Sequence, residues 1–140
     1  MNLKAVLFDL GGTLLDFDED GLQSGRKALY DFLVQKKYDV NLDRVVQISK
    51  EVWETYTLFA DKTMIEVDFQ RLMQSILYQL QIDDFANIDL IEETIKKFYC
   101  PIIERSYLLK GASNLLFKLH DTEIKVGLVT DNESEFSIMV

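Results

Sequence analysis

The stretch VLFDLGGTLLDFD, from Val6 to Asp18, decides how the rest of the sequence is interpreted. The apolar run from Leu3 to Phe8 has the length and composition of a strand that is buried on both faces. The run stops at Asp9, and the two glycines that follow allow the backbone to turn sharply. One interpretation is a plain turn without a function. The other is that the sheet fixes the Asp9 carboxylate at its edge to do chemistry.

Composition limits the class of protein. The chain has 140 residues, of which 48% are hydrophobic and 28% charged, enough for one domain with a core or for one domain and a small appendage. The formal charge of -9 argues against a nucleic acid or an anionic membrane as the main partner. We find no apolar run long enough to cross a bilayer and no signal peptide. Cys100 is the one cysteine and cannot form an internal disulfide, so we expect a reducing, cytoplasmic setting.

A long block with helical periodicity separates two strand-like runs. Apolar residues recur at three-and-four spacing in four segments, and four amphipathic helices in a row predict an antiparallel bundle. Pro101 is expected to end or kink the fourth helix. We expect Trp53, Tyr56 and Phe59 to pack in the core, because they share one helical face. The four segments span about residues 21–37, 41–59, 69–80 and 89–100.

The second strand-like run, Ile124 to Val129, follows a short helical segment from Ala112 to His120. A strand, a crossover and another strand are typical of a parallel sheet, in which the strands end on the same edge. This run also stops at polar residues, Thr130 and Asp131. We therefore expect Asp9 and Thr130 to face one another at the edge where open α/β sheets bind ligands.

A carboxylate and a hydroxyl at one sheet edge suit phosphoryl transfer. Asp9 would attack phosphorus and form an aspartyl-phosphate, which is a known covalent strategy. The glycines would bring backbone amides close to the phosphate, and Thr13 would cap the turn or donate its hydroxyl to the same anion. Mg²⁺ would be needed to offset the repulsion between the carboxylate and the phosphate.

Two segments, VLFDLGGTLLD and VGLVTDN, together resemble motifs one and two of the haloacid dehalogenase-like hydrolases. The resemblance extends from Leu3 to about Glu133. It implies an α/β fold: an incomplete Rossmann-like parallel sheet with two clear strands and a large inserted four-helix cap. Residues 1–18 and 109–140 would form the remnant of the core, and residues 19–108 would form the cap.

The resemblance also implies an activity and assigns roles to residues. Asp9 would be the nucleophile and, together with the backbone carbonyl of Gly11, a ligand of Mg²⁺. The substrate would be a small phosphorylated metabolite, which is hydrolysed by water through the aspartyl-phosphate. The phosphoryl group would be bound by Thr130, Asp131, Gly12 and Thr13.

Two features depart from the pattern of this family. Its phosphatases usually carry a second aspartate, a general acid and base, at the position of Gly11, and such proton transfer is worth roughly 100-fold to 10,000-fold. Phosphonatases of the family also have a small residue there. The basic third motif and the acidic fourth motif would lie on later strands, and we find neither in these 140 residues. We therefore expect impaired turnover.

Two other interpretations stay open. A truncated, non-catalytic relative would act as a binding or oligomerisation module, with copies of the chain associating through the open sheet edge. More remotely, DLGGT resembles the first phosphate loop of actin-like sugar kinases. In those proteins a further strand forms a hairpin after the loop, whereas the segment from Asp16 to Gly21 is acidic and leads into a helix.

Overall fold

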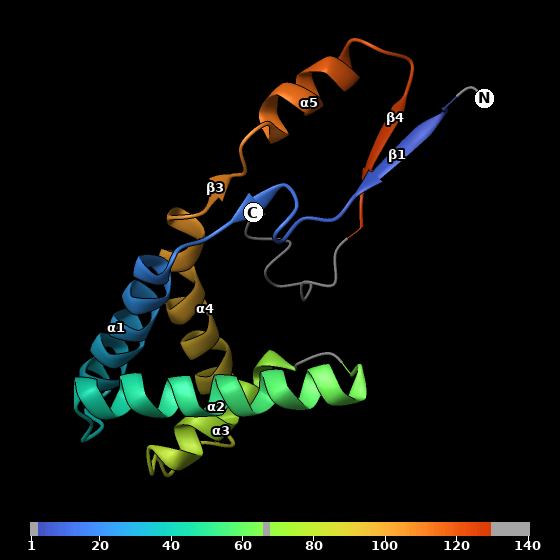
Figure 1. Cartoon of the computed structure of the whole chain (residues 1–140). Coiled ribbons are helices and arrows are strands. Elements are labelled where there is room, and N and C mark those ends of the chain that lie inside the picture. Colours follow the sequence, from blue (N-terminus) through green and yellow to red (C-terminus); the bar gives the residue numbers. More distant parts are fainter. Residues whose placement is uncertain (1–2, 66–67, 130–140) are drawn as a thin grey trace. The chain divides into compact units, whose positions relative to one another are not determined.

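The computed structural model describes residues 3–65 and 68–129, which fall into two compact units. The helical unit runs from Glu19 to Glu104, and the strand unit is formed by the described residues before and after it. The described chain is thus of mixed α/β class (Figure 1). No helix within these ranges is both long and apolar enough to span a bilayer.

The strand unit contains the parallel pair that the sequence predicts. β1 (Ala5–Phe8) pairs in parallel with β4 (Lys125–Leu128), residue for residue. The Val129 amide continues the ladder by donating to the carbonyl of Phe8 at 2.8 Å. α5 (Ala112–His120) precedes β4 in the chain, and Figure 1 shows the two strands side by side. The predicted parallel pairing of these two runs is confirmed.

A second pair of strands is not predicted from the sequence. β2 (Leu15–Asp16) pairs antiparallel with β3 (Tyr107–Leu108), and the Leu109 amide donates to the Leu14 carbonyl at 2.9 Å. Strands of this length are too short to show a periodic pattern in the sequence. Because β3 pairs with β2, residues 105–108 group with the strands, whereas the sequence analysis placed them in the helical domain.

The strand unit has a small core, and its first strand is largely exposed. Leu3 and Leu7 are 63% and 68% exposed, so the prediction that this run is buried on both faces is wrong for the described structure. Burial on both faces requires layers on each side of a sheet, and two parallel strands with one described helix do not supply them. The core residues and the partly buried ones packed on them are Leu10, Leu14, Ala112, Phe8, Leu15 and Leu116.

The helical unit consists of α1 (Glu19–Gln35), α2 (Leu42–Thr63), α3 (Phe69–Gln79) and α4 (Ile88–Glu104). Each helix contacts the next, and α4 packs back against α1. In Figure 1, α1 and α4 lie side by side, whereas α2 runs across them. The expected simple antiparallel bundle is therefore wrong for α2, since packed helices also cross at steep angles. The fully buried residues of this unit include Leu29, Leu33, Val45, Met73, Ile76, Leu77 and Ile102.

Local signals set the helix ends. The side chain of Asn41 caps α2, where its Oδ1 accepts a hydrogen bond from the Arg44 amide at 2.8 Å. Asp68 caps α3 in the same way. Pro101 lies inside α4, which continues to Glu104, so the expectation that it ends the fourth helix is wrong, while a kink at this proline stays a prediction. A proline removes one hydrogen bond of the helix, and the packing of the apolar face of α4 offsets this loss.

The second half of α2 is less buried than predicted. Phe59 is 54% exposed and Trp53 is 36% exposed, so the core positions expected for these two residues are wrong. Tyr56 is half-buried, and its hydroxyl pairs with the Ser75 hydroxyl at 2.9 Å. The buried residues of α2 are Val45, Ile48, Ser49 and Val52, all in its first half.

Candidate functional site

The candidate catalytic carboxylate lies where β1 ends. Asp9 follows Phe8 directly and is exposed. The Thr13 hydroxyl donates a hydrogen bond to Oδ2 of Asp9 at 2.9 Å. This bond orients the carboxylate, and Oδ1 is the oxygen that Thr13 does not engage. The first strand therefore presents an accessible carboxylate that is held by the turn following it.

Most hydrogen bonds of that turn are accepted by one backbone carbonyl group. The Leu10 carbonyl accepts hydrogen bonds from the amides of Leu14 at 2.9 Å and Leu15 at 3.0 Å. The Gly12 amide donates to the Leu15 carbonyl at 2.8 Å. These amides are satisfied within the turn, so they are not free to bind a phosphate in this conformation. Two residues of the turn, Gly12 and Thr13, are predicted to bind phosphate. In this conformation the Gly12 amide donates to the Leu15 carbonyl, and the Thr13 hydroxyl donates to the Asp9 carboxylate.

The backbone at position 12 has a conformation that favours glycine. Its φ angle is 71°, in the left-handed region, and a Cβ added there would meet no atom within 4 Å outside residues 11–13. We expect Gly12→Ala to lower the free energy of unfolding by about 1–2 kcal/mol, since a left-handed backbone brings Cβ close to the following carbonyl oxygen. Gly12→Asn should cost less, because asparagine tolerates this conformation. Urea unfolding measures both changes, and an equal loss in the two variants would contradict the explanation.

The second part of the predicted site follows β4. The parallel register places Asp9, after Phe8, and Val129, after Leu128, at the same edge of the sheet, where ligands bind in open α/β folds. Thr130 and Asp131 lie outside the described residues. Their approach to Asp9 and their part in phosphate binding therefore stay predictions.

The predicted Mg²⁺ ligands supply part of a coordination shell. In the described ranges, no three His, Cys, Asp or Glu side chains gather as a metal-binding group. Asp9 offers one carboxylate and Gly11 one backbone carbonyl. Proteins often bind Mg²⁺ through one or two carboxylates, with waters and substrate phosphates completing the octahedron. Asp9 and Gly11 would thus hold Mg²⁺ only together with waters and a bound phosphate, and their role as its ligands stays a prediction.

The strand after the Gly-Gly turn does not form the hairpin that is expected of a sugar-kinase phosphate loop. β2 pairs with β3 and not with β1, and the chain then enters α1 at Glu19. Nothing in this local pairing favours the kinase interpretation over the hydrolase one.

Two acidic residues where the helical unit begins, Asp18 just before α1 and Glu19 as its first residue, form ion pairs that are not predicted from the sequence. Oδ2 of Asp18 lies 3.6 Å from Nη2 of Arg105, where the chain leaves and re-enters the strand unit. Oε1 of Glu19 lies 3.0 Å from Nη1 of Arg26, and this hydrogen bond holds the pKa of Glu19 below its usual value of 4.5. The second pair has a signal in the sequence, since residues seven apart share a helical face. The first has none, because its partners are distant in the chain.

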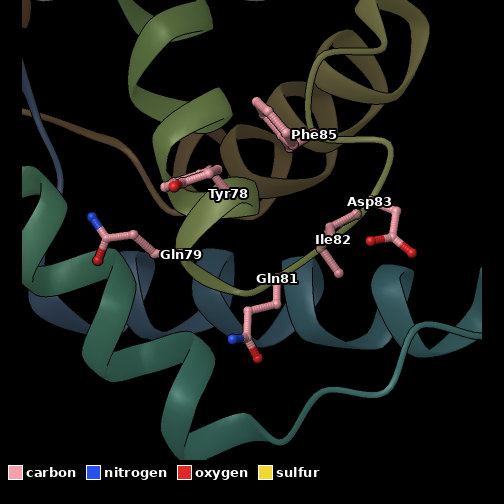
Figure 2. Close-up of a pocket in the computed structure, with 6 residues that line it drawn as sticks. All are labelled: Tyr78, Gln79, Gln81, Ile82, Asp83 and Phe85. Atoms are coloured by element: carbon pink, nitrogen blue, oxygen red, sulfur yellow. The ribbon is translucent and has the colours of Figure 1, made fainter.

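A surface hollow lies in the helical unit, at the turn that follows α3 (Figure 2). Its volume is about 480 Å³, and the rings of Tyr78 and Phe85 meet there edge to face with centroids 5.1 Å apart. It contains none of the residues that the sequence analysis selected for chemistry. The residues that line it are Tyr78, Gln79, Gln81, Ile82, Asp83 and Phe85.

Neither a model of a known protein family nor a curated protein matches this sequence. The candidate chemistry of this chain lies with the residues at the edge of the β1–β4 pair.

Proposed function

We propose that this chain is a hydrolase of the haloacid dehalogenase-like type, which transfers a phosphoryl group from a small phosphorylated metabolite to water through Asp9. The observation that carries the proposal is the parallel β1–β4 pair with an exposed, oriented carboxylate directly after β1. Ligands of open α/β sheets bind at this end of the strands. On this proposal the strand unit is the remnant of a Rossmann-like core and the helical unit is its cap.

Asp9 would act as the nucleophile through Oδ1, since Thr13 holds Oδ2. Its attack forms an oxygen–phosphorus bond and breaks the bond between phosphorus and the leaving oxygen, which gives an aspartyl-phosphate. The leaving oxygen takes a proton from water, because Gly11 has no side chain to supply one. A water molecule then attacks phosphorus, breaks its bond to Asp9 and releases inorganic phosphate.

Mg²⁺ held by the Asp9 carboxylate and the Gly11 carbonyl would neutralise negative charge on the carboxylate and the phosphate. Residues of the turn after β1 orient and position the nucleophile. The Thr13 hydroxyl fixes the orientation of the nucleophile, and the turn closed on the Leu10 carbonyl keeps both residues at the strand tip. Because the ion finds few protein ligands, its binding should be stronger when phosphate is present.

Hydrolysis of a chromogenic aryl phosphate by the full chain, with and without Mg²⁺, tests this proposal. We expect release of the phenol that requires Mg²⁺ and that EDTA abolishes. Aryl phosphates should be hydrolysed faster than alkyl phosphates, since a good leaving oxygen depends less on a general acid. Absence of turnover with both kinds of substrate would overturn the proposed activity.

The exposed apolar residues of the strand unit favour a second candidate function, a non-catalytic module for binding or oligomerisation. Leu3, Leu7 and Phe117 are 63%, 68% and 69% exposed. Among the described residues, β1 and β4 pair with each other alone, so each has an unpaired outer edge. This candidate predicts that light scattering detects a dimer or larger species, and that Leu7→Lys shifts it to the monomer. A wild-type chain that stays monomeric at high concentration would contradict self-association.

A further inference from the structure

Arg26 is a buried cation inside the helical unit. It lies in α1, and its side chain is 7% exposed, while its ion-pair partner Glu19 is 62% exposed. Nη1 of Arg26 donates to Glu19 at 3.0 Å. The Nε–H group is also buried, but it has no hydrogen-bond partner among the described residues. Buried donors in folded proteins are almost always paired, with protein or with water.

A small hollow of about 20 Å³ adjoins Arg26. A cavity needs roughly 10–15 Å³ to hold a water molecule, so this one is large enough for water and too small for a metabolite. Ser49 is the second polar residue of the wall. It is 4% exposed, and its hydroxyl donates to the Val45 carbonyl at 2.6 Å. The remaining wall is made by Leu22, Trp53, Leu72, Ile76 and Phe98.

The hydrogen-bonding capacity of the two polar residues is complementary to that of water. Nε–H of Arg26 can only donate, whereas the Ser49 oxygen still has a lone pair after it donates to Val45. A water molecule between them would accept from Arg26 and donate to Ser49. Two such partners are the minimum that buried waters usually have.

Charge decides between water and a small anion. Arg26 is already neutralised by Glu19, whose carboxylate lies 3.0 Å from its guanidinium. An anion in the hollow would therefore add an uncompensated charge to an otherwise apolar wall, which is unfavourable. A neutral acceptor such as water can accept a hydrogen bond from the Nε–H group without adding a buried charge.

We propose that the helical unit holds one structural water molecule in this hollow, bound between Arg26 Nε and Ser49 Oγ. The water completes the hydrogen bonding of Arg26. It also links α1 to α2, since Arg26 and Ser49 belong to these two helices.

A crystal structure of the full chain at high resolution tests the proposal directly. We expect density for one water at about 2.7–3.2 Å from both Nε of Arg26 and Oγ of Ser49. In solution, NMR should show a cross-peak between the Nε–H proton of Arg26 and water that remains after the contribution of chemical exchange is removed. An empty hollow, or an anion revealed by anomalous scattering after a bromide soak, would overturn the proposal.

Ser49→Ala provides the variant test, with Ser24→Ala as its matched control. Both serine hydroxyls donate to the carbonyl four residues earlier in a helix, but Ser24 does not line the hollow. The water and its cross-peak should be lost in Ser49→Ala and kept in Ser24→Ala. Retention of the water in both variants would remove Ser49 from the site. If Ser49→Ala does not fold, the density in the wild-type chain decides.

Discussion

Replacing Asp9 with asparagine is expected to abolish phosphoryl transfer. A carboxamide has nearly the shape of a carboxylate, and its oxygen still accepts a hydrogen bond from Thr13, so the turn after β1 should keep its conformation. The asparagine carboxamide is, however, too weak a nucleophile to form the covalent intermediate. Loss of a covalent nucleophile costs on the order of 10⁴-fold to 10⁶-fold in rate. The measurement is the Mg²⁺-dependent hydrolysis of an aryl phosphate by Asp9→Asn and by the wild-type chain.

Asp16→Asn serves as the control for this variant. Asp16 is a carboxylate of the same unit that accepts a hydrogen bond from the Phe17 amide at 2.8 Å, and an asparagine oxygen can accept the same bond. We expect Asp16→Asn to retain the wild-type rate. Equal rates for the wild-type chain and Asp9→Asn would show that Asp9 takes no part in the reaction.

Replacing Gly11 with aspartate is expected to raise the rate on alkyl phosphates by roughly 100-fold to 10,000-fold, the usual contribution of a general acid and base. The new carboxyl group could protonate the leaving oxygen and later accept a proton from the attacking water. The backbone allows the change: within the described ranges the glycines with positive φ are Gly12 and Gly111, so Gly11 has a conformation open to other residues. Steady-state rates on alkyl and aryl phosphates measure the effect.

Gly11→Asn separates proton transfer from a mere change in shape. Asparagine has the size of aspartate but cannot act as a general acid at neutral pH. The account expects a gain for Gly11→Asp that is largest on substrates with poor leaving groups, and no gain for Gly11→Asn. A similar gain in both variants would assign the effect to packing or to the turn.

The paired strands and the helices were predictable because their signals are local. The apolar run before Asp9 and the run ending at Val129 each form a strand, and the three-and-four spacing of apolar residues locates the four helices. Asn41 caps α2, and asparagine is one of the residue types that favour this position. Parallel pairing of the strands followed from the crossover that joins them.

The features that were missed depend on tertiary contacts. Each of β2 and β3 has two residues, and their pairing joins segments far apart in the chain. The exposure of Leu7 reflects how few layers surround β1, which an apolar run cannot reveal. Phe59 lies on the apolar face of a helix, but the buried residues of α2 all lie in its first half.

The candidate site was predictable in part. The position of Asp9 at the end of β1 followed from the sequence, because the apolar run stops there. The hydrogen bond from Thr13 to Asp9 was not foreseen, since Thr13 was assigned to the turn or to the phosphate. An orientation of this kind depends on the geometry of the Gly-Gly turn, and the identities of its residues do not specify it.

Mass spectrometry of the full chain, quenched with acid during turnover of an aryl phosphate, tests the role of Asp9 most directly. Without an acid and base at Gly11, attack by water on the intermediate should be slow, so the aspartyl-phosphate should accumulate. We expect a phosphoryl group on the peptide that contains Asp9, removed by hydroxylamine and absent in Asp9→Asn. Turnover with no phosphorylated peptide, or with phosphate on another residue, would contradict it.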